Sequence, residues 1–120
     1  MRKGLLITLM LATAILTLSP LLAEDAATFQ GEVVDMACYI THGAKGADHA
    51  DCAKKCVKNG EPMGLLTADG KLLLLAASHD DAAPFEALKD LAGSQAKVTG
   101  VLAERDGVPM VTVTGASAAE

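Results

Sequence analysis

Residues 63–76 read M-G-L-L-T-A-D-G-K-L-L-L-L-A, and this stretch decides the predicted fold. Two apolar runs, 63–67 and 71–76, flank an Ala-Asp-Gly segment. An Asp-Gly pair between two apolar runs is a strong signal for a β-hairpin. The four consecutive leucines at 72–75 do not alternate with polar residues, which suits a strand covered on both faces or a helix segment. The Asp-Gly turn favours two strands.

On the C-terminal side of this hairpin the pattern predicts a short helix. Residues 78–81, S-H-D-D, offer helix N-caps, Pro84 fits the first turn, and Gly93 follows the last residue of an apolar stripe with helical spacing. We expect His79 to be a surface or capping residue rather than a ligand.

A second hairpin follows this helix. Residues 96–102 and 110–114 form two largely apolar, alternating runs around an Asp-Gly turn at 106–107. Gly100 inside the first run predicts a bulge or a tight bend. We expect residues 116–120 to form a flexible tail.

On the N-terminal side, residues 28–36 read T-F-Q-G-E-V-V-D-M and alternate well enough for a first strand, with Phe29 and Val33 as core candidates. This strand leads directly to Cys38. The stretch that begins there, C-Y-I-T-H-G-A-K-G-A-D-H-A-D-C-A-K-K-C, ends at Cys56 and holds all three cysteines and two of the three histidines.

Residues 48–59 predict a helix within this stretch, because they contain no proline or glycine and Gly60 follows them. At about 100° per residue, His49, Cys52 and Cys56 fall within roughly 60° of one another on that helix. One face would therefore carry an imidazole and two thiols, with lysines on the opposite side.

These residues predict a soft metal site. Cys38 lies on a different element and could fold over the helix face as a fourth ligand beside His49, Cys52 and Cys56. Three cysteines and one histidine are a familiar tetrahedral set for zinc, and thiolates also suit Cu(I). We expect one ion, either structural or carried.

Other residues nearby could modify this site. His42 could replace a ligand from the loop at 41–47, which the glycines at 43 and 46 make flexible. An approach by Met36 or Met63 would favour Cu(I), because thioethers prefer soft metals. Tyr39 could donate a hydrogen bond to a thiolate or pack as an ordinary half-buried aromatic residue.

Two interpretations without metal stay open. A disulfide from Cys38 to Cys52 or Cys56 would staple an exported domain and leave one thiol over. The thiols could also do redox chemistry, because a helix N-terminus and nearby lysines lower a thiol pKa, although Asp48 and Asp51 oppose that effect.

The first 23 residues have the pattern of a secretory signal peptide. Arg2 and Lys3 precede an apolar run of about 14 residues, which is short of the roughly 20 that span a bilayer, and a small residue, Ala23, precedes the predicted cut. We therefore expect a periplasmic or secreted protein that is not embedded in a membrane after cleavage. Residues 24–27 would be a short leader, and 28–115 would form one domain.

Composition narrows the function classes. Cleavage would leave 8 basic and 15 acidic residues, a net charge of −7, with one tyrosine and two phenylalanines. Nucleic-acid binding needs a basic face and stacking aromatics, so we expect none. The chain has no G-x-S-x-G or H-E-x-x-H motif and no obvious pair of carboxylates with a base, so we expect no enzymatic activity. No protein partner is indicated.

The predicted order is strand, ligand helix, strand, strand, helix, strand, strand. Five strands with a helix between the third and fourth are typical of a small OB-like barrel. The fold class is therefore mainly β with two short helices, and the ligand helix is inserted between strands one and two.

Four segments also carry a family resemblance: G-E-V-V-D-M-A-C-Y (31–39), H-A-D-C-A-K-K-C (49–56), G-E-P-M-G (60–64) and V-T-G-V-L (98–102). In these segments the chain resembles a group of small, poorly characterised exported bacterial proteins with OB-like domains. The resemblance covers most of the mature chain, and its most specific part is the spacing of glycine, cysteine and histidine. It implies a periplasmic location and a Cys/His site, and it implies no settled activity.

Overall fold

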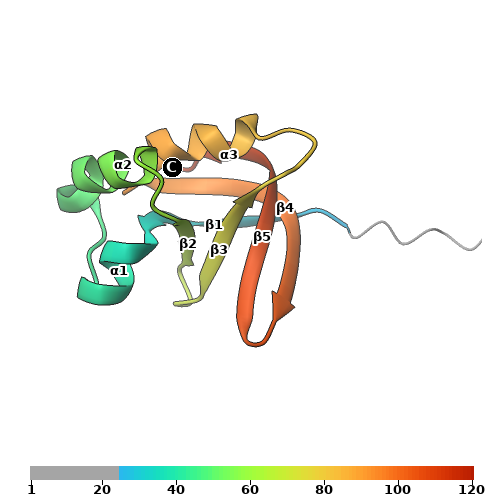
Figure 1. The fold of residues 1–120 in the computed structure, drawn as a ribbon, viewed down its shortest axis with the longest axis horizontal. Helices are drawn as coiled ribbons and strands as arrows, with labels where there is room; N and C mark the ends of the chain where they lie inside the picture. Colours follow the sequence, from blue (N-terminus) through green and yellow to red (C-terminus); the bar gives the residue numbers. More distant parts are fainter. Residues whose placement is uncertain (1–24) are drawn as a thin grey trace, which may run out of the picture.

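The computed structural model describes residues 25–120, so the predicted signal peptide lies outside the described residues. Five strands, three α-helices and two 3₁₀ helices make up this part of the chain (Figure 1). In chain order they are β1 (Ala27–Asp35), α1 (Met36–His42), η1 (Ala47–His49), α2 (Ala50–Lys58), β2 (Met63–Thr67), β3 (Leu72–Ala77), α3 (Ala83–Leu88), η2 (Lys89–Leu91), β4 (Gln95–Arg105) and β5 (Val108–Ala118). Within residues 25–120, no helix is both long enough and apolar enough to cross a membrane.

The five strands form one sheet that closes on itself in the order β1-β2-β3-β5-β4. β1 pairs antiparallel with both β2 and β4, and the parallel pair of β3 and β5 completes the closure. The predicted mainly β class, with five strands and a helix between the third and fourth, is confirmed. Figure 1 shows α1 and α2 one above the other at one end of this sheet, with α3 beside α2.

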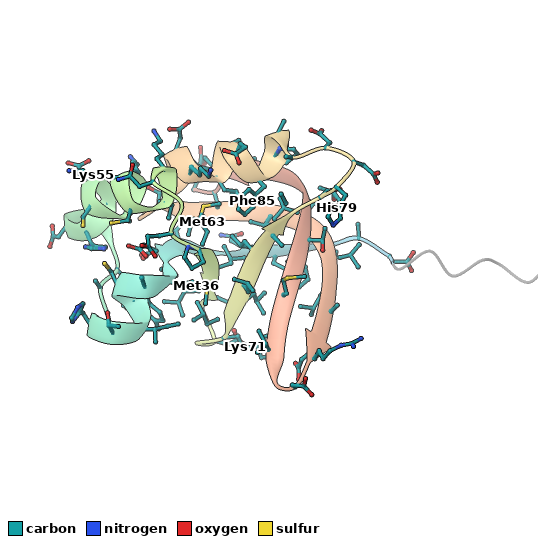
Figure 2. The ribbon with its side chains drawn as sticks, in the orientation of Figure 1. Met36, Lys55, Met63, Lys71, His79 and Phe85 are labelled. Atoms are coloured by element: carbon teal, nitrogen blue, oxygen red, sulfur yellow. The ribbon has the colours of Figure 1, made fainter. Side chains whose placement is uncertain are left out.

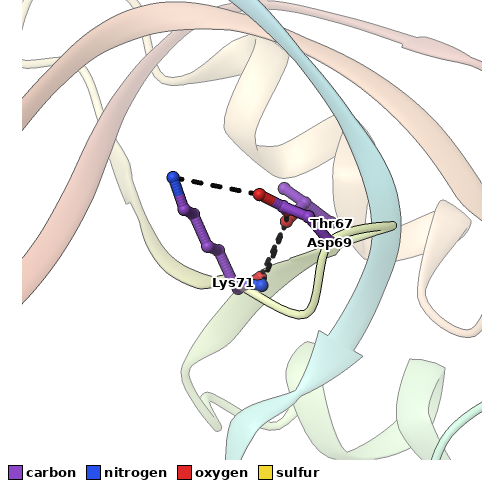
Figure 3. Close-up of polar contacts among 3 residues, drawn as sticks. All are labelled: Thr67, Asp69 and Lys71. Carbon is purple, nitrogen blue, oxygen red and sulfur yellow. Dashed lines mark hydrogen bonds and ion pairs between the residues drawn. The ribbon is translucent and has the colours of Figure 1, made fainter.

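The 63–76 stretch forms the predicted hairpin of β2 and β3. Polar contacts hold its turn (Figure 3). The Thr67 hydroxyl donates to the Asp69 carboxylate, and the Lys71 N–H donates to the Thr67 hydroxyl over 3.2 Å. The Lys71 ammonium lies 3.8 Å from the same carboxylate. These contacts explain why the Asp-Gly signal identified the turn correctly.

The hydrophobic core lies inside the closed sheet and continues under α2. Leu73 and Leu75 of β3 are buried, whereas Leu72 and Leu74 are half-buried, so the leucine run is fully covered on one face only. The buried core residues come from the strands, α2, α3 and the segment after η2: Val33, Ala53, Val57, Met63, Leu65, Leu73, Leu75, Leu88, Ala92, Ala96, Val98, Val111 and Val113. Two of them belong to α2, so this helix is fixed to the sheet.

The connection between β1 and β2 holds two α-helices, α1 and α2, where the sequence predicted one. The domain therefore has three α-helices, and the prediction of two was wrong. α1 begins after Asp35, whose carboxylate Oδ1 accepts hydrogen bonds from the N–H groups of Ala37 (2.9 Å) and Cys38 (3.4 Å). It ends at Gly43, whose φ of 68° lies in the left-handed region that favours glycine. Cys38 consequently lies on a helix rather than at the start of a loop.

Other boundaries also differ from prediction. The expected helix at 48–59 begins as η1 and continues as α2, so His49 ends a 3₁₀ turn instead of lying within the α-helix. The expected flexible tail at 116–120 is wrong for its first three residues, because β5 extends to Ala118 and pairs with the start of β4. The predicted bulge at Gly100 is confirmed by a register shift between Thr99 and Gly100.

Gly93 brings the segment after η2 against the start of α2. Its φ is 82°, and a Cβ at this position would lie 2.4 Å from Cα of Ala50. Its N–H also donates to the Val33 carbonyl over 2.7 Å. Gly93 therefore joins α2 to β1 through a close approach that only glycine permits.

We expect Gly93→Ala to destabilise the protein more than Gly107→Ala. The two glycines have φ values of 82° and 83°, so both substitutions carry the left-handed cost of about 1–2 kcal/mol. Only Gly93 adds a backbone clash, because no described atom lies within 4 Å of a Cβ at Gly107. Thermal unfolding should separate the two variants by at least roughly 4 °C in Tm, which is about 1 kcal/mol for a domain of this size. Equal Tm values would contradict the close approach.

Candidate metal centre

Side chains from three elements meet at the end of the sheet where α1 and α2 lie. Asp35 ends β1, Cys38 belongs to α1, and His49 ends η1. A carboxylate oxygen, a thiol sulfur and a ring nitrogen, one from each of these residues, all lie within 4.8 Å of one another. Three potential metal ligands therefore converge although they belong to separate elements.

This group overlaps only partly with the predicted ligand set. Cys38 and His49 are brought together, whereas Cys52 and Cys56 on α2 lie outside the three-residue group. Asp35 was not predicted. Its position at the end of an apolar strand is visible in the sequence, but its N-cap role depends on α1, which the sequence did not predict.

Asp35 is the one buried charged side chain among the described residues, with 1% of its surface exposed. Its Oδ1 caps α1, whereas its Oδ2 is buried and has no hydrogen-bond partner within residues 25–120. The thiols of Cys38 and Cys56 lie beside this carboxylate, but a thiol is only a weak donor and does not replace a full partner for Oδ2.

His49 presents a second unpartnered atom. Its ring is half-buried, and Nε2 finds no hydrogen-bond partner in the described part of the chain. The backbone holds it in place, because the His49 N–H donates to the Gly46 carbonyl over 3.1 Å. The Gly46 N–H in turn donates to Oε2 of Glu32 on β1 over 2.9 Å. The loop that carries His49 is thus connected to the sheet.

The three cysteines, all within the described residues, are free thiols. Cys38 and Cys56 are half-buried, and Cys52 is exposed. Hydrogen bonding to the Asp35 carboxylate raises the pKa of Cys38, and burial and the negative charge of Asp35 raise it further. A hydrogen bond with Cys56 lowers it in part. Burial raises the pKa of Cys56 to about 11, and Asp35 and Cys52 add to this effect. The two shifts show that Cys56 lies close enough to interact with Asp35 and Cys38.

This arrangement favours a cation. A buried polar atom without a partner costs about 1–3 kcal/mol, and two such atoms lie in this cluster. Hydrogen bonding to Asp35 raises the pKa of Cys38 and burial raises the pKa of Cys56, and both effects favour the protonated thiols. A bound metal ion would replace those protons and give both unpartnered atoms a ligand bond.

The other residues that the sequence suggested are His42, Tyr39, Met36, Met63 and His79. His42 is exposed at the end of α1, and Tyr39 is half-buried. Met63 is buried in the core, and the Met36 side chain lies against Gly64 of β2. Figure 2 shows His79 at the far end of the domain from α1 and α2, where it is exposed as expected.

Comparison of the chain with protein-family models, with curated proteins and with solved structures finds no match.

In the reduced, metal-free protein we expect Cys56 to react slowly with iodoacetamide at pH 8. Only the thiolate attacks, and a pKa of about 11 leaves little of it until the pH rises towards that value. Asp35→Asn removes the charge but keeps an oxygen that can cap α1. It should lower the pKa of Cys38 and Cys56 and speed their alkylation, measured for each cysteine by mass spectrometry of peptides.

Asp51→Asn is the matched control for this measurement. Asp51 is an exposed carboxylate on α2, and it contributes to neither thiol shift. Identical alkylation rates in the Asp35→Asn and Asp51→Asn proteins would show that the Asp35 carboxylate does not control these thiols.

Proposed function

We propose that this chain is a small exported protein that binds one zinc or Cu(I) ion through a Cys3His-type site. The donors come from the set that the sequence identified: Cys38, His49, Cys52 and Cys56. We propose a binding role rather than a catalytic one, in the periplasm or outside the cell. The signal-like pattern at 1–23 and the resemblance to exported bacterial proteins support this location.

The observation that carries the proposal is the pair of unpartnered buried atoms beside a thiol. Oδ2 of Asp35 and Nε2 of His49 have no hydrogen-bond partner among residues 25–120, and both side chains lie within ligand reach of Cys38. Buried polar groups in native proteins are almost always satisfied, and a bound ion is one of the few explanations for an exception, beside an ordered water or a catalytic role. Thiolate and imidazole donors prefer zinc and Cu(I) over magnesium or calcium.

We further propose that residues 28–115 form an OB-like domain. The strand order β1-β2-β3-β5-β4 and the helix between β3 and β4 support this assignment. In OB-folds the connection between strands one and two contributes to binding. Here that connection carries Cys38, His49, Cys52 and Cys56.

The alternative is a disulfide-stapled domain or a thiol-redox protein without metal. One observation favours it, since Cys38 and Cys56 come from different helices and interact through their thiols. The raised pKa of both thiols argues against nucleophilic redox chemistry at neutral pH, because an attacking cysteine needs a low pKa.

We expect the mature protein, isolated from the periplasm without added reductant, to show a native mass that exceeds the chain by one zinc or copper ion. After denaturation, all three cysteines should react with a thiol alkylator. A native mass without metal, together with two bonded cysteines and one alkylated cysteine, would replace the proposed function by the disulfide alternative.

Single substitutions test which residues hold the ion. We expect Cys38→Ala, His49→Ala and Cys56→Ala each to weaken metal binding by at least about tenfold, the loss that even outer-shell changes cause. Lys55→Ala is the control, because Lys55 is exposed on α2 (Figure 2). Metal content, measured by mass spectrometry after dialysis against a chelator, should fall only in the first three variants. Equal metal content in all four would contradict the site.

A further inference from the structure

We infer that Asp35, rather than Cys52, is the fourth donor of the site, and that the bound ion is therefore zinc rather than Cu(I). This inference rests on the proposed metal-binding function and changes one of its donors. The resulting set consists of one carboxylate oxygen, one ring nitrogen and two thiolate sulfurs: Asp35, His49, Cys38 and Cys56.

Burial separates Asp35 from Cys52. The Asp35 carboxylate is 1% exposed and shares its three-residue group with Cys38 and His49. Cys52 and Cys56 both lie outside that group, but Cys52 is exposed whereas Cys56 is half-buried. A thiol in contact with water does not need an ion, whereas a buried carboxylate oxygen without a partner does.

The cap of α1 prepares Asp35 for this role. Two backbone N–H groups hold Oδ1 at 2.9 and 3.4 Å, which fixes the carboxylate and leaves Oδ2 for the ion. Metal-binding carboxylates are commonly oriented by such hydrogen bonds. The bond lengths of tetrahedral zinc place its ligand atoms about 3.3–3.8 Å apart. The three donor atoms already lie within 4.8 Å of one another, so small side-chain rotations would close the site.

Cys56 is the remaining sulfur donor. It is half-buried, and its thiol interacts with the Asp35 carboxylate. Two neighbouring residues of α2, Ala53 and Val57, are buried in the core. α2 therefore presents Cys56 from a fixed position.

Charge then selects the ion. Cys38 and Cys56 as thiolates and Asp35 as a carboxylate bring three negative charges to a site whose carboxylate is buried and whose thiols are half-buried. Zinc leaves one of them uncompensated, whereas Cu(I) leaves two. Uncompensated buried charge is strongly unfavourable. Donor type points the same way, because zinc accepts oxygen, nitrogen and sulfur together, whereas Cu(I) is selected by soft sulfur ligands.

The test measures zinc and Cu(I) affinities of the metal-free mature protein by competition with chromophoric chelators. Asp35→Asn should weaken zinc binding by at least about tenfold and leave Cu(I) binding nearly unchanged. Asp51→Asn is the matched control and should bind zinc like the wild type. Cys52→Ala should also retain zinc, whereas Cys38→Ser should lose it. Circular dichroism and Tm of each metal-free variant check folding, and asparagine keeps the N-cap of α1.

X-ray absorption of the wild-type zinc protein identifies the donor atoms without any substitution. We expect two sulfur atoms at about 2.3 Å and two lighter scatterers, nitrogen and oxygen, at about 2.0–2.2 Å. Three sulfurs and one nitrogen would overturn the role of Asp35 and restore Cys52 as the donor.

The outcomes separate the inference from the proposed function. If Asp35→Asn binds zinc like the wild type while Cys38→Ser does not, the inference fails and the metal site stands. If the wild-type protein holds Cu(I) and cannot hold zinc, the assignment of the ion is wrong. If it binds neither ion, the inference and the proposed function fail together.

Discussion

The hydrogen bonds from the Ala37 and Cys38 N–H groups to the Asp35 carboxylate join β1 to α1, and the candidate site depends on them. They allow a charged group to be buried at a strand end, where an unpaired carboxylate would be strongly unfavourable. They also start the helix that carries Cys38. Because they engage only Oδ1, the other oxygen stays available to whatever lies between Asp35, Cys38 and His49. The Asp35 side chain thus determines where α1 begins and also places a carboxylate oxygen beside Cys38 and His49.

The closed sheet fixes the remaining parts of the site through contacts that are distant in sequence. α2 is held by the burial of Ala53 and Val57 in the core. Its start is held by the close approach of Gly93, which also bonds to β1. The loop before His49 is tied to β1 through Glu32. The strands therefore position the candidate donor groups, which lie on helices too short to be stable alone.

The sequence predicted the strands well because each carried a local signal, such as the Asp-Gly turn at 69–70 or the glycine bulge at position 100. It also placed Cys38 and His49 in one candidate ligand set, and the structure brings these two residues together with Asp35. It missed α1, since Met36–His42 is too short for a helical stripe to be recognised. It missed Asp35 because alternation placed that residue in a strand, and nothing local shows which polar residue will be buried. The pairing of residues 116–118 with β4 depends on a register between strands, and the spacing of residues along the chain does not reveal that register.

The parallel pairing of β3 with β5 has a consequence for the order in which the chain assembles. It joins Leu74 to Met110, so the sheet cannot close until the last strand is in place. The donor groups, in contrast, all lie between residues 35 and 56, and short loops close at low entropic cost and quickly. Topologies rich in distant pairings fold slowly. We therefore expect the thiols to come within reach of one another before the strands that hold their helices in place have all paired.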